Sequence, residues 1–241
     1  MLNNAAYSLA DASLELPLAE SSTRTALNKL TEESSSWTLD EDLLMLTMKS
    51  RMIAATWDTL GWTLFREGKL NEGMSYVEAS WHNWPSSETG KHVGEMLETR
   101  GDNAGAIAAY EAAIALEPGY NPMGARTKPT EKQKQLQAMA DKLRRSSGKT
   151  STQAHNPVVQ ERAMPLGPAN GRSGNAEYRI LLKEGKAVRS EPFNDKTVPG
   201  AKAMVAGGNF DNLFPAGSHA ALVRTGFVNC HANVCELILE R

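Results

Sequence analysis

The sequence is poor in the residue types that usually mark a catalytic or metal-binding centre. It has 2 cysteines and 5 histidines among 241 residues. The two cysteines are not followed by a second close pair, as they would be in most tetrahedral zinc sites. The histidines, at positions 82, 92, 155, 219 and 231, form no recognisable nucleophile–base pattern, and each is expected to be a surface or packing residue. The sequence therefore predicts no enzyme, no catalytic residue, no metal site and no cofactor.

Long apolar stretches are also missing. No run approaches the ~20 residues that a membrane-spanning helix needs. Residues 1–21 have neither a basic start nor a long apolar core, so no signal peptide is predicted there. These residues look like the inside of a helix rather than a natural start, which favours the chain being a piece of a longer exported protein.

The formal net charge is only −2, but positive charge is scarce in the first half of the chain and negative charge is scarce in its middle part. Residues 1–120 carry 8 Lys and Arg against 18 Asp and Glu, whereas residues 121–176 carry 10 against 3, and residues 177–241 carry 8 against 7. Such asymmetry indicates separate segments. The basic middle part contains no aromatic residue for stacking on bases. It is therefore expected to be a solvated helix and linker, with no nucleic-acid partner.

Glycine and proline recur at a fixed spacing in the first half of the chain. Positions 33 residues apart match in three pairs, which are Gly61 and Gly94, Gly68 and Gly101, and Pro85 and Pro118. A period of this length is typical of stacked helical hairpins. The first pair is expected where two helices cross closely, the second at left-handed turns between helices, and the prolines where a helix ends.

These units resemble the tetratricopeptide repeat (TPR). The matching residues are Trp57, Leu60, Gly61, Leu64, Gly68, Gly73, Val77, Ser80 and Pro85 in one copy, and Val93, Gly94, Gly101, Ala106, Tyr110, Ala113 and Pro118 in the next. A degenerate copy spans residues 2–30, with a lengthened turn at 11–16. A loop follows at 31–38, and Thr38 or Asp40 could cap a long helix that starts at Leu39. The resemblance implies an α-solenoid of about three helix pairs over residues 1–147, closed by a capping helix at 130–147.

In this family the first helix of each pair lines an inner groove that binds proteins or peptides. The resemblance places the following residues there: Ala55, Asp58, Trp62, Phe65, Arg66, Glu88, Lys91, Glu95, Glu98 and Thr99. The acidic groups beside Trp62 and Phe65 disfavour a clamp for a carboxylate and favour an apolar peptide with basic residues. A competing interpretation is that the basic segment 126–149 of the chain itself lies in the groove.

The remaining chain is predicted to contain a linker and a small α+β domain. Residues 148–176 are rich in Gly, Pro, Ser and Asn, which is typical of a flexible linker. Residues 177–241 alternate apolar and polar positions in a β-β-α-β-β order. This part resembles the C-terminal domain of TonB-type proteins in Gly185, Val188, Ser190, Phe210 and the run from Phe214 to Gly217. The extra cysteines and a missing aromatic motif before the last hairpin depart from that family.

Cys230 and Cys235 flank a short predicted hairpin loop. Opposed positions in a hairpin lie at a distance that a disulfide can bridge, and such a bond would indicate an oxidising compartment. Two inert thiols, or a metal site with His219 and His231, remain open alternatives.

The combined interpretation is a protein-interaction scaffold. Its partner-binding residues are predicted to be Asp58, Trp62, Phe65, Arg66, Lys91, Glu95 and Glu98. The combination of repeats and tail is similar to the C-terminal part of large exported bacterial proteins, some of which carry a transglutaminase-like domain upstream. An accessory fragment of such an enzyme is therefore the alternative function. The expected location is the periplasm or cell envelope, with the cytoplasm as the alternative.

Overall fold

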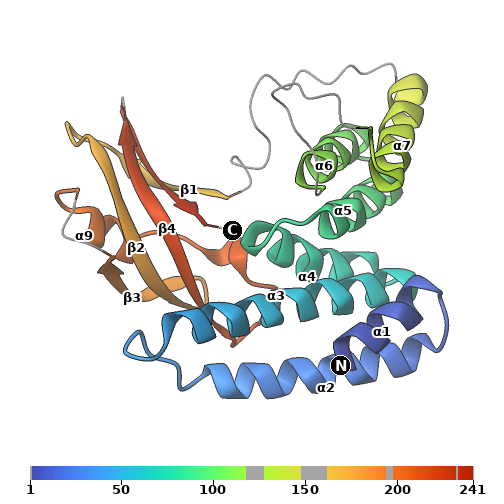
Figure 1. Cartoon of the computed structure of the whole chain (residues 1–241), viewed down its shortest axis with the longest axis horizontal. Coiled ribbons are helices and arrows are strands. Elements are labelled where there is room, and N and C mark those ends of the chain that lie inside the picture. The colour runs from blue at the N-terminus through green and yellow to red at the C-terminus, as the bar shows by residue number, and fades with distance from the viewer. Residues whose placement is uncertain (1, 118–127, 148–161, 194–197, 232, 241) are drawn as a thin grey trace.

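The computed structural model describes residues 2–117, 128–147, 162–193, 198–231 and 233–240. Helices fill the first part of the chain and an antiparallel sheet fills the last part, with the sheet standing at one end of the helical layer (Figure 1). The expected combination of a helical part with a mixed helix-and-sheet part is confirmed.

The helical part consists of helices that pack in sequential pairs. Their bounds are α1 Leu2–Asp11, α2 Leu16–Ser34, α3 Leu43–Arg66, α4 Leu70–Asn83, α5 Ser87–Arg100, α6 Asn103–Leu116 and α7 Glu131–Ser147. Helix α1 packs on α2, α3 on α4 and α5 on α6, while α2, α4 and α6 each also contact the helix that follows. The N-cap of α3 is Asp42, which accepts a hydrogen bond from the Met45 amide, so neither predicted cap, Thr38 or Asp40, is correct. Asp42 is the residue directly before the first helical turn, where a side-chain oxygen can reach the free amides.

The glycines lie where their spacing predicted. A Cβ atom on Gly94 would approach Cε1 of Tyr110 to 2.3 Å, so α5 and α6 can cross this closely only without a side chain. Gly101 follows α5 with a φ of 85°, a conformation that glycine adopts without strain. Helix α4 ends at Asn83, just before Pro85, as expected. Pro118 lies outside the described residues.

Among the described residues, strands form one antiparallel sheet in the order β1-β5-β4-β2-β3. Their bounds are β1 Ala163–Pro168, β2 Gly174–Lys183, β3 Lys186–Pro192, β4 Ala221–His231 and β5 Val234–Leu239. A short helix, α9 Ala201–Ala206, and a 3-10 turn, η1 Asp211–Leu213, connect β3 to β4. Strand β1 and the start of β2 fall inside the predicted linker 148–176, so the linker prediction is wrong for these residues. Residues 148–161 of that linker lie outside the described residues. Strand β1 contains Pro165 and Pro168, which an edge strand tolerates because one side of its backbone has no partner strand.

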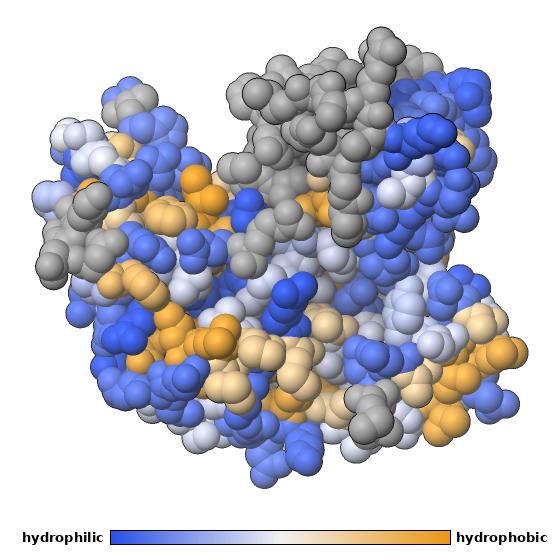
Figure 2. Space-filling model, in the orientation of Figure 1, coloured by the Kyte–Doolittle hydropathy of each residue, from blue (hydrophilic) through white to orange (hydrophobic). Residues whose placement is uncertain are grey.

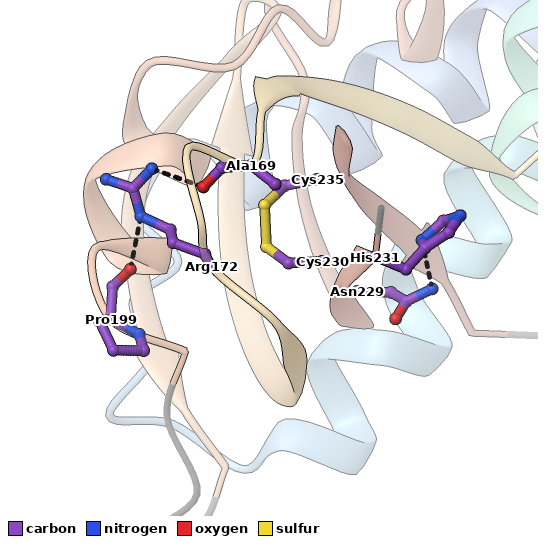
Figure 3. Close-up of a disulfide and its surroundings, with 7 residues drawn as sticks. All are labelled: Ala169, Arg172, Pro199, Asn229, Cys230, His231 and Cys235. Atoms are coloured by element: carbon purple, nitrogen blue, oxygen red, sulfur yellow. Dashed lines mark hydrogen bonds between the residues drawn. A yellow bond between two sulfur atoms is a disulfide. The ribbon is translucent and has the colours of Figure 1, made fainter. Parts of the chain in front are cut away.

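A disulfide joins Cys230 and Cys235, which face each other across the β4–β5 hairpin (Figure 3). Their Cα atoms lie 4.1 Å apart, and both side chains are buried. Beside the disulfide, Arg172 donates hydrogen bonds to the carbonyl oxygens of Ala169 and Pro199. Of the alternatives for the cysteines, the structure contains the disulfide, and the described residues include no cluster of three or more groups able to hold a metal ion.

The sheet packs directly on the helices. The first residues of β4 pair with β2, but β5 pairs with β4 only from Gly226 onward, so the other edge of β4 lacks a strand partner over these residues. The hydroxyl oxygens of Ser34 and Ser50 accept the hydrogen bonds of Ala221 and Val223, each at 2.8 Å. Helix side chains thus replace the missing strand, and apolar residues of α2 and α3 share one core with those of the sheet. In the described parts of the chain, no helix is long and apolar enough to cross a membrane.

Candidate binding groove

A cavity of about 850 Å³ lies between α1, α3 and the turn from α4 to α5. Its wall includes Tyr7 of α1, Arg51 and Ala55 of α3, and Trp84 at the end of α4. Glu88 of α5 adds a carboxylate, and the ends of α6 and α7 close one side. The cavity is therefore built from side chains that are far apart in the sequence, with aromatic and charged groups on one surface.

The predicted aromatic anchor Trp62 is not part of this surface. Its side chain is 0% exposed and stacks on His92 with ring centroids 4.1 Å apart. Arg66 and Lys91 each place their cationic group 5.3 Å from the centre of the indole ring. Phe65 is partly buried, 5.2 Å from Trp62. In this structure a partner cannot contact Trp62, because neighbouring side chains of the protein cover it.

The predicted acidic residues are paired with basic side chains of the protein itself. Asp58 lines the cavity, but its carboxylate lies 3.0 Å from Nδ1 of His92. Glu95 pairs with Lys91 at 3.3 Å, and Glu98 pairs with Lys142 at the same distance. The negative charges that suggested a basic partner are therefore already balanced by the protein's own cations.

Helix α7 does not occupy the cavity as the basic segment 126–149 was proposed to do. It packs along α6, where Arg144 forms an ion pair with Glu111. Only Lys132, in its first turn, reaches the cavity wall. The ends of the proposed segment, residues 126–127 and 148–149, lie outside the described residues.

His92 is the centre of a buried polar cluster that the sequence interpretation treated as ordinary packing. Its Nε2 lies 3.5 Å from Oε1 of Glu88, while its Nδ1 faces Asp58. The hydroxyl of Tyr7 donates to the same Glu88 oxygen at 2.8 Å, and Lys132 donates to the other oxygen. The cluster ties α1, α3, α5 and α7 together. The separation of Glu88 and His92 by four residues, one helical turn, is the sequence signal that could have indicated it.

The cluster fixes the charge of its members. Burial alone would lower the pKa of His92, but the nearby charge of Asp58, its hydrogen bond and Glu88 outweigh burial and raise that pKa to about 9. The close approach of His92, whose Nε2 lies 3.5 Å from the Glu88 carboxylate, holds the pKa of Glu88 well below its usual range, against the effect of burial. Burial, followed by the contact with Glu88, raises the pKa of Tyr7 above its usual range. Near neutral pH an imidazolium therefore lies between two carboxylates.

This cluster predicts a loss of stability at alkaline pH. The pKa of His92 is about 9 in the folded state, against 6.5 for an ordinary, unperturbed imidazole. Its contribution is therefore complete below pH 6.5 and disappears as the pH rises through 9, a loss of about 3 kcal/mol at most. Urea unfolding followed from pH 6 to pH 10 measures it. The His92→Gln variant should be less stable at pH 6 and should show a flatter profile, and an equally steep profile in this variant would assign the effect to other groups.

Several arginine side chains lie close to Trp84. The guanidinium of Arg224, on β4, lies 3.5 Å from the centre of the Trp84 ring, and its side chain is almost fully buried. Burial, together with the positive charges of Arg162 and Arg51, lowers the pKa of Arg224 to about 9. Of these arginines, Arg51 lines the cavity and is exposed. The cavity wall therefore contains the cation of Arg51 and the ring of Trp84, and Arg224 packs against that ring.

The chain matches no protein-family model, and no curated protein and no solved structure is similar enough to count as a match.

Proposed function

We propose that this chain is a binding protein without catalytic activity that holds a segment of a partner protein in the groove between α1, α3 and α5. The observation that carries this proposal is the cavity of about 850 Å³, which combines Tyr7 and Trp84 with the exposed cation of Arg51. Aromatic and arginine side chains contribute most strongly to protein interfaces. The buried cluster around His92 holds the walls in place before a partner arrives, which lowers the entropy cost of binding.

The proposal extends to the architecture of the helical part, which we interpret as a TPR-type solenoid. Each helix pair contacts the next through its second helix, as stacked repeats require. The close crossings at Gly61 and Gly94 and the left-handed turns at Gly68 and Gly101 support the same register in both copies. Helix α7 follows the last pair and carries polar residues on its outer side, which suits a capping helix.

The sheet supports the proposed TonB-like domain only in part. Strands β2 to β5 with α9 follow the expected β-β-α-β-β order, and β1 adds an edge strand to it. A disulfide persists in oxidising compartments, so the bond between Cys230 and Cys235 is compatible with the proposed location in the periplasm or cell envelope.

Selection of peptides on the intact chain tests the binding function. Random peptides displayed on phage should give families that bind the unmodified protein. We expect these peptides to lose at least about tenfold in affinity, a change of ~1.4 kcal/mol, on the Ala55→Arg variant. Ala55 is exposed on the cavity wall, so arginine there fills the groove without disturbing the core. Fluorescence anisotropy with the synthetic peptides gives the affinities.

Ala104→Arg is the matched control, because Ala104 is an exposed alanine on α6 that does not line the cavity. Selected peptides should bind this variant as they bind the unmodified protein. Equal binding to the Ala55→Arg variant, or a selection that enriches no peptide family, would refute binding in the groove.

A further inference from the structure

An uncovered apolar stripe runs along the N-terminal half of α3. Its members are Leu44, Met45, Met48 and Met52, which are 70%, 51%, 56% and 55% exposed. Positions 44, 48 and 52 repeat every four residues, so they lie on one face of the helix. Figure 2 shows apolar surface in this region, in a band over α3 near the lower part of the view. We call these four residues the methionine stripe.

The methionine stripe continues the wall of the groove. Arg51 lies between Met48 and Met52 in the sequence, and Ala55 is one turn further along the same face. Both Arg51 and Ala55 line the cavity. Helix α3 spans 24 residues, and its N-terminal half runs toward the sheet, past α1 and α5 (Figure 1). A ligand that lies along α3 can therefore touch the stripe and the cavity together.

The composition of the stripe suits recognition of another helix. Large apolar side chains that lie next to one another and remain exposed often mark an interaction site. Methionine is unbranched and flexible, and its thioether adapts to partners of different shape. An amphipathic helix laid against an apolar surface is one of the recurring modes of peptide recognition.

The charged groups near the stripe indicate which charge a partner should carry. Lys49 pairs with Glu33, and Asp42 is engaged as the cap of α3. The carboxylate of Glu41 accepts a hydrogen bond from the Thr38 amide. Arg51 is exposed and has no ion pair within the described part of the chain. Glu41 and Asp42 keep their negative charge, but they lie at the start of α3, before the first residue of the stripe. Beside Met48 and Met52, the charge without an ion pair among the described residues is the positive one of Arg51.

We infer that the methionine stripe and Arg51 bind an amphipathic helical segment of a partner protein that carries carboxylates beside its apolar face. This inference rests on the proposed function, because Arg51 belongs to the same groove. It replaces the basic peptide expected from the sequence with an acidic one. A second copy of the chain is the weaker candidate. A stable interface between two proteins buries roughly 1,200–2,000 Å², and four side chains on one helix provide only a small part of that area.

Two synthetic amphipathic peptides with the same leucine face test the inference, one flanked by glutamates and the other by lysines. The intact protein is labelled with ¹³C in its methionine methyl groups, and each peptide is titrated into it. The acidic peptide should shift the methyl resonances of Met48 and Met52 and bind at least about tenfold more tightly than the basic one. The Arg51→Glu variant should reverse this preference.

A double variant, Met48→Gln with Met52→Gln, should lose binding of the acidic peptide. Leu18→Gln is the control, because Leu18 is 56% exposed on α2, away from the stripe. Equal binding of the two peptides, or binding that leaves the Met48 and Met52 methyl resonances unshifted, overturns the inference. Shifts that depend on protein concentration without peptide also overturn it, because a second copy would then cover the stripe.

Failure of this inference is distinguishable from failure of the proposed function. Peptides selected on the intact chain are measured on the Met48→Gln, Met52→Gln variant as well. If they still bind there and lose affinity only on Ala55→Arg, the groove binds a partner and the stripe does not. If Ala55→Arg leaves them bound, the proposed function itself is wrong.

Discussion

Replacing Gly94 with leucine is expected to destabilise the helical part by about 3 kcal/mol or more, at the upper end of the cost of overpacking a core. A Cβ atom at this position would lie 2.3 Å from Cε1 of Tyr110, far inside contact distance. The tyrosine ring is 0% exposed, and its hydroxyl donates to Glu98 at 3.3 Å, so the ring has little room to move aside. Helices α5 and α6 must separate instead. Urea unfolding followed by far-ultraviolet circular dichroism measures the change.

Gly101→Leu is the matched control, since it places the same side chain seven residues further along. A side chain at Gly101 would meet nothing within 4 Å, but the φ of 85° is unfavourable for leucine. The cost should be the ~1–2 kcal/mol of a left-handed residue. Equal losses in the two variants would show that backbone conformation, and not the close crossing of α5 and α6, explains the requirement for glycine.

The helical half was largely predictable because its signals are local. Glycines at a 33-residue spacing mark both the crossings and the turns, and each position is set by backbone geometry that only a few residue types allow. The expected capping helix at 130–147 corresponds to α7, Glu131–Ser147. Alternation of apolar and polar residues likewise predicted the order of β2, β3, α9, β4 and β5.

The rest depended on contacts that a single segment does not encode. Strand β1 contains Pro165, Gly167 and Pro168, a composition typical of a linker, and it becomes a strand because β5 offers it a free edge. The contact between sheet and helices depends on Ser34 and Ser50, two small polar residues with no distinctive sequence pattern. The direct packing of the sheet on the helices was therefore not predicted.

The candidate site shows the same limit. The resemblance to the tetratricopeptide repeat predicts Trp62 on an inner, partner-facing side of α3, but it does not say which side chains lie opposite the tryptophan. In the structure His92 stacks on Trp62, and Tyr7 of α1 lies beside His92 with ring centroids 6.0 Å apart. Helix α1 thus helps to cover Trp62 and His92 from solvent. The exposed part of the groove is displaced toward Arg51 and Trp84.

Trp62→Ala is consequently expected to lower the free energy of unfolding by about 3–5 kcal/mol, the usual cost of removing a fully buried aromatic side chain. The sequence alone favoured the opposite result, a loss of binding with little loss of stability. Trp62→Phe should cost much less, because the indole nitrogen has no hydrogen-bond partner to lose and a phenyl ring can still stack on His92. Urea unfolding of the three proteins at pH 7 ranks them.

The Trp62→Ala variant also tests whether the indole ring maintains the polar cluster around His92. Without the ring, water can reach His92, and solvent weakens the attraction of the imidazolium to Asp58 and Glu88. The pKa of His92 should then fall from about 9 toward its ordinary value, which can be followed by the chemical shifts of the imidazole protons. The stability profile between pH 6 and pH 10 should flatten accordingly. If Trp62→Ala leaves both stability and the pKa of His92 unchanged, the ring does not belong to the core, and it would again be a candidate for direct contact with a partner.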